Sequence, residues 1–110
     1  MQKIALALVV GFAGPAVGQS FLTGNDFLEM CETDTVGALR YAMGTFDLAT
    51  VLQPFLIEEA VLACPPQSIT AGQVQDVSCQ YVRDNPAVRH YPASSLVWGA
   101  IRAAWPCATP

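Results

Sequence analysis

The chain has 110 residues, of which 53% are hydrophobic and 13% are charged, and its formal net charge is −4. This length leaves room for one small domain. The acidic balance argues against binding to nucleic acid or to anionic membrane surfaces, because such binding depends on basic patches and counterion release. An uncharged or basic partner fits better.

The first 18 residues have the pattern of an export signal. Lys3 supplies a positive charge, residues 4–14 form an apolar run, and "AVG" before Gln19 places small residues at a cleavage site. We expect cleavage after Gly18, with Ala16 as the second choice. A membrane anchor is the alternative, but the run is shorter than the ~20 residues that span a bilayer. The sequence therefore predicts a signal peptide over 1–18, a domain over 19–110, and no membrane insertion after cleavage.

Removal of Lys3, the only lysine, leaves four arginines against nine carboxylates. Four cysteines remain, and an exported protein meets an oxidising compartment. Two disulfides are therefore expected, although the residues alone permit three connectivities. Each pairing of distant cysteines would stabilise the fold by roughly 4 kcal/mol through loop closure. A zinc site is disfavoured because the sequence has no C-x-x-C and no close His/Cys pair.

The first predicted element of the domain is a short helix over residues 23–32. Thr23 or Asn25 is the candidate N-cap. The helical period places Phe27, Leu28 and Cys31 on one face. This face is expected to pack against the rest of the domain.

The longest predicted helix covers residues 34–52, with Asp34 or Thr35 as its N-cap. Its expected apolar stripe consists of Val36, Leu39, Met43, Phe46 and Ala49. Pro54 interrupts this helix and is expected to begin a second, short helix within 54–64. The prolines at 65 and 66 end that helix.

The clearest helix signal lies in residues 70–86. Thr70 and Gln73 form the pattern of a capping box, and Asn85-Pro86 stops the helix. Val74, Val77 and Tyr81 share one face. Cys79 points away from that face and is expected to meet a second neighbouring element or solvent.

The last predicted helix follows Pro92 and ends before Pro106. Its core stripe has full helical spacing and consists of Ala93, Leu96, Val97, Ala100, Ile101 and Ala104. The sequence therefore predicts an all-α domain of four or five helices, stapled by about two disulfides.

Enzyme chemistry is disfavoured. His90 is the only histidine, and a general base would need a nucleophile such as Ser94 or Ser95. These serines occupy the first turn of a predicted helix, where serine is common, so His90 is interpreted as a loop side chain. Glu58 and Glu59 are adjacent and point in different directions, which makes a shared proton difficult. We predict no catalytic, metal-binding or cofactor-binding residue, and a protein that acts by binding.

The motifs resemble one known family. The segments "GNDFLEMCE", "RYAMGTFDLA" and the stretch from "CPPQSITAGQ" to "AIRAAWPC" are similar to the Rap/Tai family. Its members are periplasmic immunity proteins against type VI secreted peptidoglycan amidases. The resemblance runs from Gly24 to Cys107, and its most specific part is the C-terminal half.

The resemblance also bears on the cysteines. Cys31, Cys64 and Cys107 match family cysteines, whereas Ala42 stands where the family usually has another one. That missing cysteine would ordinarily pair with Cys31, and this chain has Cys79 on the neighbouring helix. We therefore expect the pairs Cys31–Cys79 and Cys64–Cys107. The missing cysteine also raises the question of a diverged function.

The resemblance implies a protein, typically a homodimer, that binds an amidase and blocks a cleft whose catalytic residues belong to the toxin. It implies no cofactor. Residues 53–60 and 65–72 are the candidate inserting segments. An aromatic side chain off the core stripe is a reasonable interface anchor. The candidate partner-binding residues are Glu58, Glu59, Gln67 and Trp98.

Two alternatives from other classes remain. A small periplasmic acid-stress chaperone has similar size, export and disulfides. Acid-driven repulsion would be weak here, because only four arginines, His90 and the N-terminus carry positive charge at low pH. The other alternative is a non-enzymatic binding domain for an unknown ligand.

Overall fold

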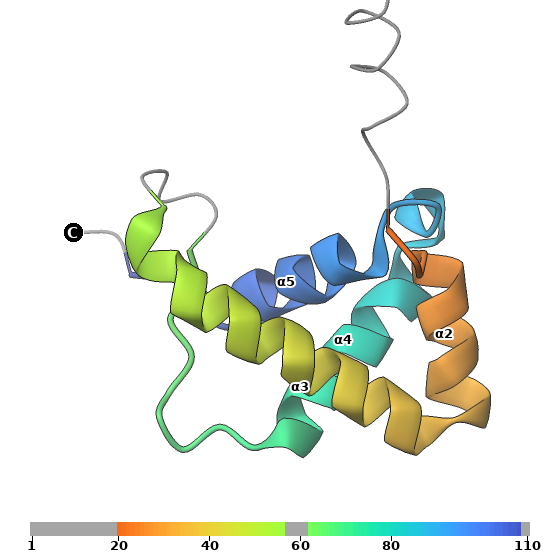
Figure 1. Cartoon of the computed structure of the whole chain (residues 1–110), viewed down its shortest axis with the longest axis horizontal. Helices are drawn as coiled ribbons and strands as arrows, with labels where there is room; N and C mark the ends of the chain where they lie inside the picture. Colours follow the sequence, from red (N-terminus) through yellow and green to blue (C-terminus); the bar gives the residue numbers. More distant parts are fainter. Residues whose placement is uncertain (1–19, 57–61, 109–110) are drawn as a thin grey trace, which may run out of the picture.

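The structure, a computed structural model, describes residues 20–56 and 62–108, so the expected signal segment 1–18 lies outside it. The described residues form four α-helices and no β-strand, which confirms the all-α prediction (Figure 1). The helices are α2 (Gly24–Thr33), α3 (Thr35–Leu52), α4 (Ala71–Asp84) and α5 (Ala93–Ala104). Each of them contacts the other three, with α3 lying across α4 and α5 and α2 closing one end (Figure 1).

The helix starts follow the predicted capping residues. At α2 the Thr23 side chain accepts from the Asp26 N–H and the Asp26 carboxylate accepts from the Thr23 N–H, a reciprocal pair. Thr23 is thus the cap, and the alternative, Asn25, lies inside the helix. Thr70 and Gln73 make the same reciprocal pair at α4, as predicted. Asp34 caps α3 by accepting from the N–H of Gly37.

The predicted stripe of α5 forms most of its core face. Ala93, Leu96, Val97, Ala100 and Ile101 are all buried, whereas Ala104, in the last turn, is exposed. Phe27 of α2 is fully buried and lies against Tyr41 of α3, with ring centroids 5.7 Å apart. The core of the domain is therefore built where α2 and α3 meet α4 and α5.

The predicted apolar stripe of α3 is confirmed only in part, because Leu39, Phe46 and Ala49 are half-buried. Val36 is 57% exposed and Met43 is 39% exposed, and the buried residues of this helix are Ala38 and Ala42. These two alanines are four residues apart and share one face. Their small side chains let α3 lie close against its neighbours. The larger Tyr41 and Phe46 pack against the core while remaining half-buried.

α4 is buried on two sides. Val74, on the predicted face, is buried, and Val77 and Tyr81 are half-buried. Cys79 is also buried, and its disulfide partner lies in α2. The second neighbour expected for Cys79 is therefore α2. Ser78 and Val82 complete the buried set of α4.

Both expected disulfides are present. Cys31–Cys79 joins α2 to α4 with Cα atoms 5.8 Å apart, and Cys64–Cys107 joins the connection after α3 to the end of the chain with Cα atoms 4.8 Å apart. The first is buried, whereas Cys64 is exposed. Ala42 is buried without any part in this pairing.

The helix expected within 54–64 is reduced to one 3₁₀ turn, η1 (Gln53–Phe55). Pro54 is the second residue of this turn, one position later in it than predicted, and Leu56 has extended backbone angles and leaves the helical region. Residues 57–61 lie outside the described part, and residues 62–70 have no helix. Gln53 and Ala63, on either side of the part that is not described, lie close together, because the Gln53 side chain exchanges two hydrogen bonds with the Ala63 backbone.

Residues 85–92 form a turn that holds the start of α2. The turn contains a second 3₁₀ segment, η3 (Pro86–Val88). The Gly24 N–H donates to the carbonyl of Tyr91, and the Asn25 N–H donates to the carbonyl of Arg89, both at 2.9 Å. The Arg89 side chain donates in turn to carbonyls at the end of α4. A cation there complements the helix dipole.

Candidate protein-binding surface

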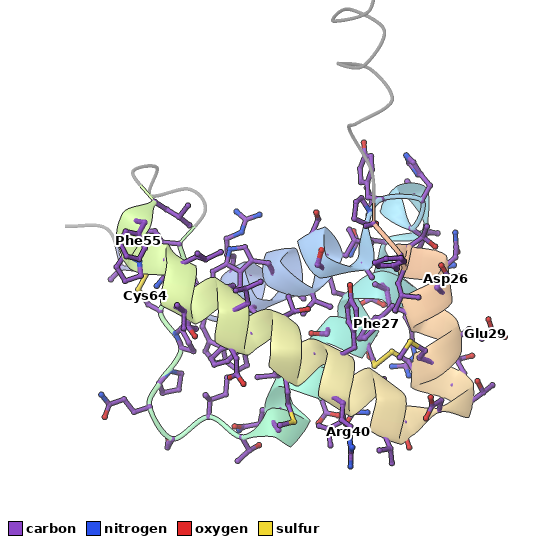
Figure 2. The ribbon with its side chains drawn as sticks, viewed as in Figure 1. Asp26, Phe27, Glu29, Arg40, Phe55 and Cys64 are labelled. Carbon is purple, nitrogen blue, oxygen red and sulfur yellow. A yellow bond between two sulfur atoms is a disulfide. The ribbon has the colours of Figure 1, made fainter. Side chains whose placement is uncertain are left out.

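The end of α3 is tied to the C-terminal segment through Ala63 and Cys64. The Gln53 side-chain amide and the Ala63 backbone exchange two hydrogen bonds. The Cys64 N–H donates to the carbonyl of Trp105 at 2.8 Å, and Cys64 bonds to Cys107. Figure 2 shows Phe55 at the end of the α3 ribbon, on the same side of the molecule as Cys64. These interactions fix where α3 and η1 end.

Exposed large apolar side chains gather at this end of α3. Within nine consecutive residues, five such side chains are exposed: Leu48, Val51, Leu52, Phe55 and Leu56. We call these five residues the α3 apolar surface. Phe55 is 79% exposed and Leu48 is 61% exposed. Contiguous exposed apolar residues on a soluble domain mark an interaction site more often than scattered ones do.

A groove beside this surface separates α3 from α5. Its volume is about 250 Å³, and Trp98 of α5 is half-buried in its wall. The other lining residues are Thr45, Leu48, Ala49, Leu52, Ser94 and Ser95. We call it the α3–α5 groove. It combines apolar walls with three hydroxyl groups, a composition suited to an apolar side chain of another protein.

Two further hollows lie elsewhere. One, of about 170 Å³, lies between α3 and the start of α4, beside Phe46 and Ile69. The other, of about 400 Å³, is more polar and lies over the Cys31–Cys79 disulfide, next to Arg83. Arg83 forms an ion pair with Glu32 at 3.4 Å. Both partners are largely exposed, so this pair adds little to stability.

Within the described residues, the His90 side chain is not hydrogen-bonded to a group that could act with it in catalysis. It is exposed, and its ring packs against that of Tyr91 with centroids 4.3 Å apart. No hydrogen bond in the described part of the chain joins it to a carboxylate or a hydroxyl. Ser94 and Ser95 are exposed in the first turn of α5.

The described residues contain no cluster of three or more His, Cys, Asp or Glu side chains that could hold a metal ion. The four cysteines of the described part are all in disulfides. Over the same ranges, no helix combines the length and the apolar character needed to cross a membrane.

The four predicted contact residues do not form one cluster in the described part of the structure. Glu58 and Glu59 lie outside the described residues. Gln67 is exposed in a turn of the connection after Cys64, and Trp98 lines the α3–α5 groove. The structure does not bring Gln67 into that groove.

The α3 apolar surface was missed by the sequence reasoning. Apolar residues occur on nearly every side of this helix, so their spacing could not show which side would be covered. Two alanines four residues apart were the available signal for the buried face.

One family model matches the chain. It is described as Rap1a immunity proteins and matches residues 23–107. This range contains all four helices and both disulfides. No curated protein and no solved structure matches the chain.

Proposed function

Since the chain belongs to the Rap1a immunity protein family and is therefore an immunity protein against a toxin, we propose that its target is a peptidoglycan amidase delivered by type VI secretion. The protein would bind the amidase and block its active-site cleft. The family match over residues 23–107 is the observation that carries this proposal. The similarity of the C-terminal half to the Rap/Tai motifs supports the choice of an amidase.

The proposed compartment is the periplasm, reached by export with cleavage near Gly18. Two disulfides support an oxidising location, because such bonds are rare in reducing compartments. A peptidoglycan amidase acts in the same compartment, so the inhibitor must be there to protect the cell.

The proposed mode of action is binding without catalysis. The exposed apolar residues of α3 supply a contact surface, and the acidic chain would attract a basic toxin. The family resemblance also implies a homodimer, which we include in the proposal. Light scattering of the purified chain would measure its mass directly.

Periplasmic co-expression tests the proposed function. A panel of type VI secreted peptidoglycan amidases with a catalytic cysteine is directed to the periplasm, one at a time, with and without the immunity protein. We expect lysis without it and growth with it. The matched control lacks residues 1–18, keeps the protein in the cytoplasm, and should not protect. Equal lysis in the presence and absence of the full chain would refute the proposal.

A further inference from the structure

We propose that the α3 apolar surface, together with the α3–α5 groove, is the binding site for the toxin. We infer that the toxin segment bound there presents one large apolar side chain flanked by a basic one. This inference rests on the proposed function, because it takes the partner to be the toxin.

The α3 apolar surface exposes large side chains to water. Leu48, Val51 and Phe55 are each more than 60% exposed. The favourable free energy of burial grows with the apolar area removed from water, so covering several of these side chains provides a strong driving force. Aromatic residues at the centre of such surfaces commonly dominate binding energy. Phe55 is therefore the expected anchor on this chain.

The α3–α5 groove borders the α3 apolar surface directly. Leu48 and Leu52 belong both to the α3 apolar surface and to the wall of the α3–α5 groove. A partner that covers the surface therefore also reaches the groove, where a single apolar side chain can pack against Trp98. Hydroxyl groups of Ser94 and Ser95 line the same groove and can bond to the partner's backbone.

The helix that carries this surface is held in place on its inner side and at its end. α3 is fixed along its inner side by the buried Ala38 and Ala42. Its end is fixed by the two hydrogen bonds between Gln53 and Ala63. A surface that is already ordered loses little conformational entropy on binding, which favours affinity.

The charge of Asp47 favours the toxin over other possible occupants of the α3 apolar surface. Asp47 is the only charged residue in the range 45–56, and it is exposed. Symmetric contact with a second copy would bring two Asp47 carboxylates to one apolar interface, where like charges repel. A lipid surface is disfavoured because this range has no basic side chain. Asp47 lines the hollow between α3 and the start of α4, so a toxin segment with Lys or Arg on that side of its apolar residue complements it.

Binding measurements with purified proteins test this site. The probe is the amidase that the chain neutralises in the co-expression test, inactivated at its catalytic cysteine. We expect Phe55→Ala and Leu48→Gln to weaken binding at least tenfold. The matched control is Val36→Gln, which changes an equally exposed side chain at the other end of the same helix and should stay within about twofold of wild type. Circular dichroism would establish that the variants remain folded.

A cross-linking experiment identifies the occupant directly. The photoreactive residue p-benzoyl-phenylalanine replaces Phe55 in one chain and Val36 in another. Irradiation of each mixture with the amidase should give a covalent adduct with the amidase from position 55 and none from position 36. An adduct between two copies of this chain from position 55 would overturn the inference.

The remaining outcomes separate this inference from the proposed function. If wild type binds the amidase and Phe55→Ala and Leu48→Gln bind equally well, the inference is wrong while the proposed function stands. If wild type does not bind the amidase at all, both are wrong.

Discussion

Gln53 and Ala63 are joined by two hydrogen bonds that close the connection after α3. The amide nitrogen of Gln53 donates to the carbonyl of Ala63 at 2.9 Å, and the Ala63 N–H donates to Oε1 of Gln53 at 2.8 Å. Only a side-chain amide offers both a donor and an acceptor in this geometry. The pair therefore depends on the identity of residue 53.

The substitution Gln53→Glu tests this pair. A carboxylate can still accept from Ala63 but has no N–H to donate, and its second oxygen faces the Ala63 carbonyl. We expect the free energy of unfolding to fall by about 1–2 kcal/mol. Urea unfolding measures this change, and Gln67→Glu adds the same charge at an exposed site of the same connection as a control. Equal losses in the two variants would contradict the assigned role.

Gly24 is expected to tolerate no side chain. A Cβ atom there would lie 2.8 Å from the carbonyl oxygen of Arg89 and 2.9 Å from its Cα, and backbone atoms cannot move aside easily. Gly24→Ala should lower the free energy of unfolding by about 1–3 kcal/mol. Gly44→Ala is the matched control because nothing lies within 4 Å of its Cβ position.

That control should change stability in the opposite direction. Alanine favours the helix interior over glycine by up to about 1 kcal/mol, so Gly44→Ala should stabilise the protein. Thermal unfolding of both variants measures the contrast. A loss of stability in Gly44→Ala similar to that in Gly24→Ala would show that close packing at Gly24 is not the cause.

The two disulfides should differ in their reactivity toward a dithiol. Cys31 and Cys79 are 6% and 5% exposed, whereas Cys64 is exposed and Cys107 half-buried. Because attack on a disulfide needs access to sulfur, limited reduction should open Cys64–Cys107 first. Alkylation followed by peptide mapping would show which cysteines are labelled. Earlier labelling at Cys31 and Cys79 would contradict this order.

Ser78→Ala should raise stability. The Ser78 hydroxyl is fully buried and has no hydrogen-bond partner among the described residues. Burial of an unpaired hydroxyl costs about 1–3 kcal/mol, and removal of one oxygen leaves only a small void. We expect the free energy of unfolding to rise by about 1 kcal/mol in chemical denaturation. Ser95→Ala, at an exposed position, should change it little, and a clear loss in Ser78→Ala would mean that the hydroxyl has a partner.

Local sequence patterns predicted the helix starts well. Each start depends on residues within one turn, such as Thr70 with Gln73, so distant contacts need not be known. The face of α5 was also predictable, because its apolar residues follow one stripe. The face of α3 was not, since Ala38 and Ala42 compete with larger apolar residues on its other sides.

The candidate site depended on that unpredictable face. Whether Leu48 or Phe55 is covered follows from how α3 packs, and spacing within one helix does not encode this. The bonds between Gln53 and Ala63 join residues ten apart across an irregular connection, for which no periodic signal exists. The disulfide pairing was predicted correctly, but it came from the family resemblance, because the residues alone left three connectivities open.

The hydrogen bonds between residues 85–92 and the start of α2 affect the order in which the chain can fold during synthesis. The Leu22 carbonyl accepts from the Ala93 N–H, and the Gly24 N–H donates to Tyr91, so the first described segment docks against nearly the last. During synthesis Gly24 emerges long before its partner exists. The start of α2 therefore lacks the contacts that hold it until almost the whole chain is available, so this end of the domain is expected to become ordered late in folding.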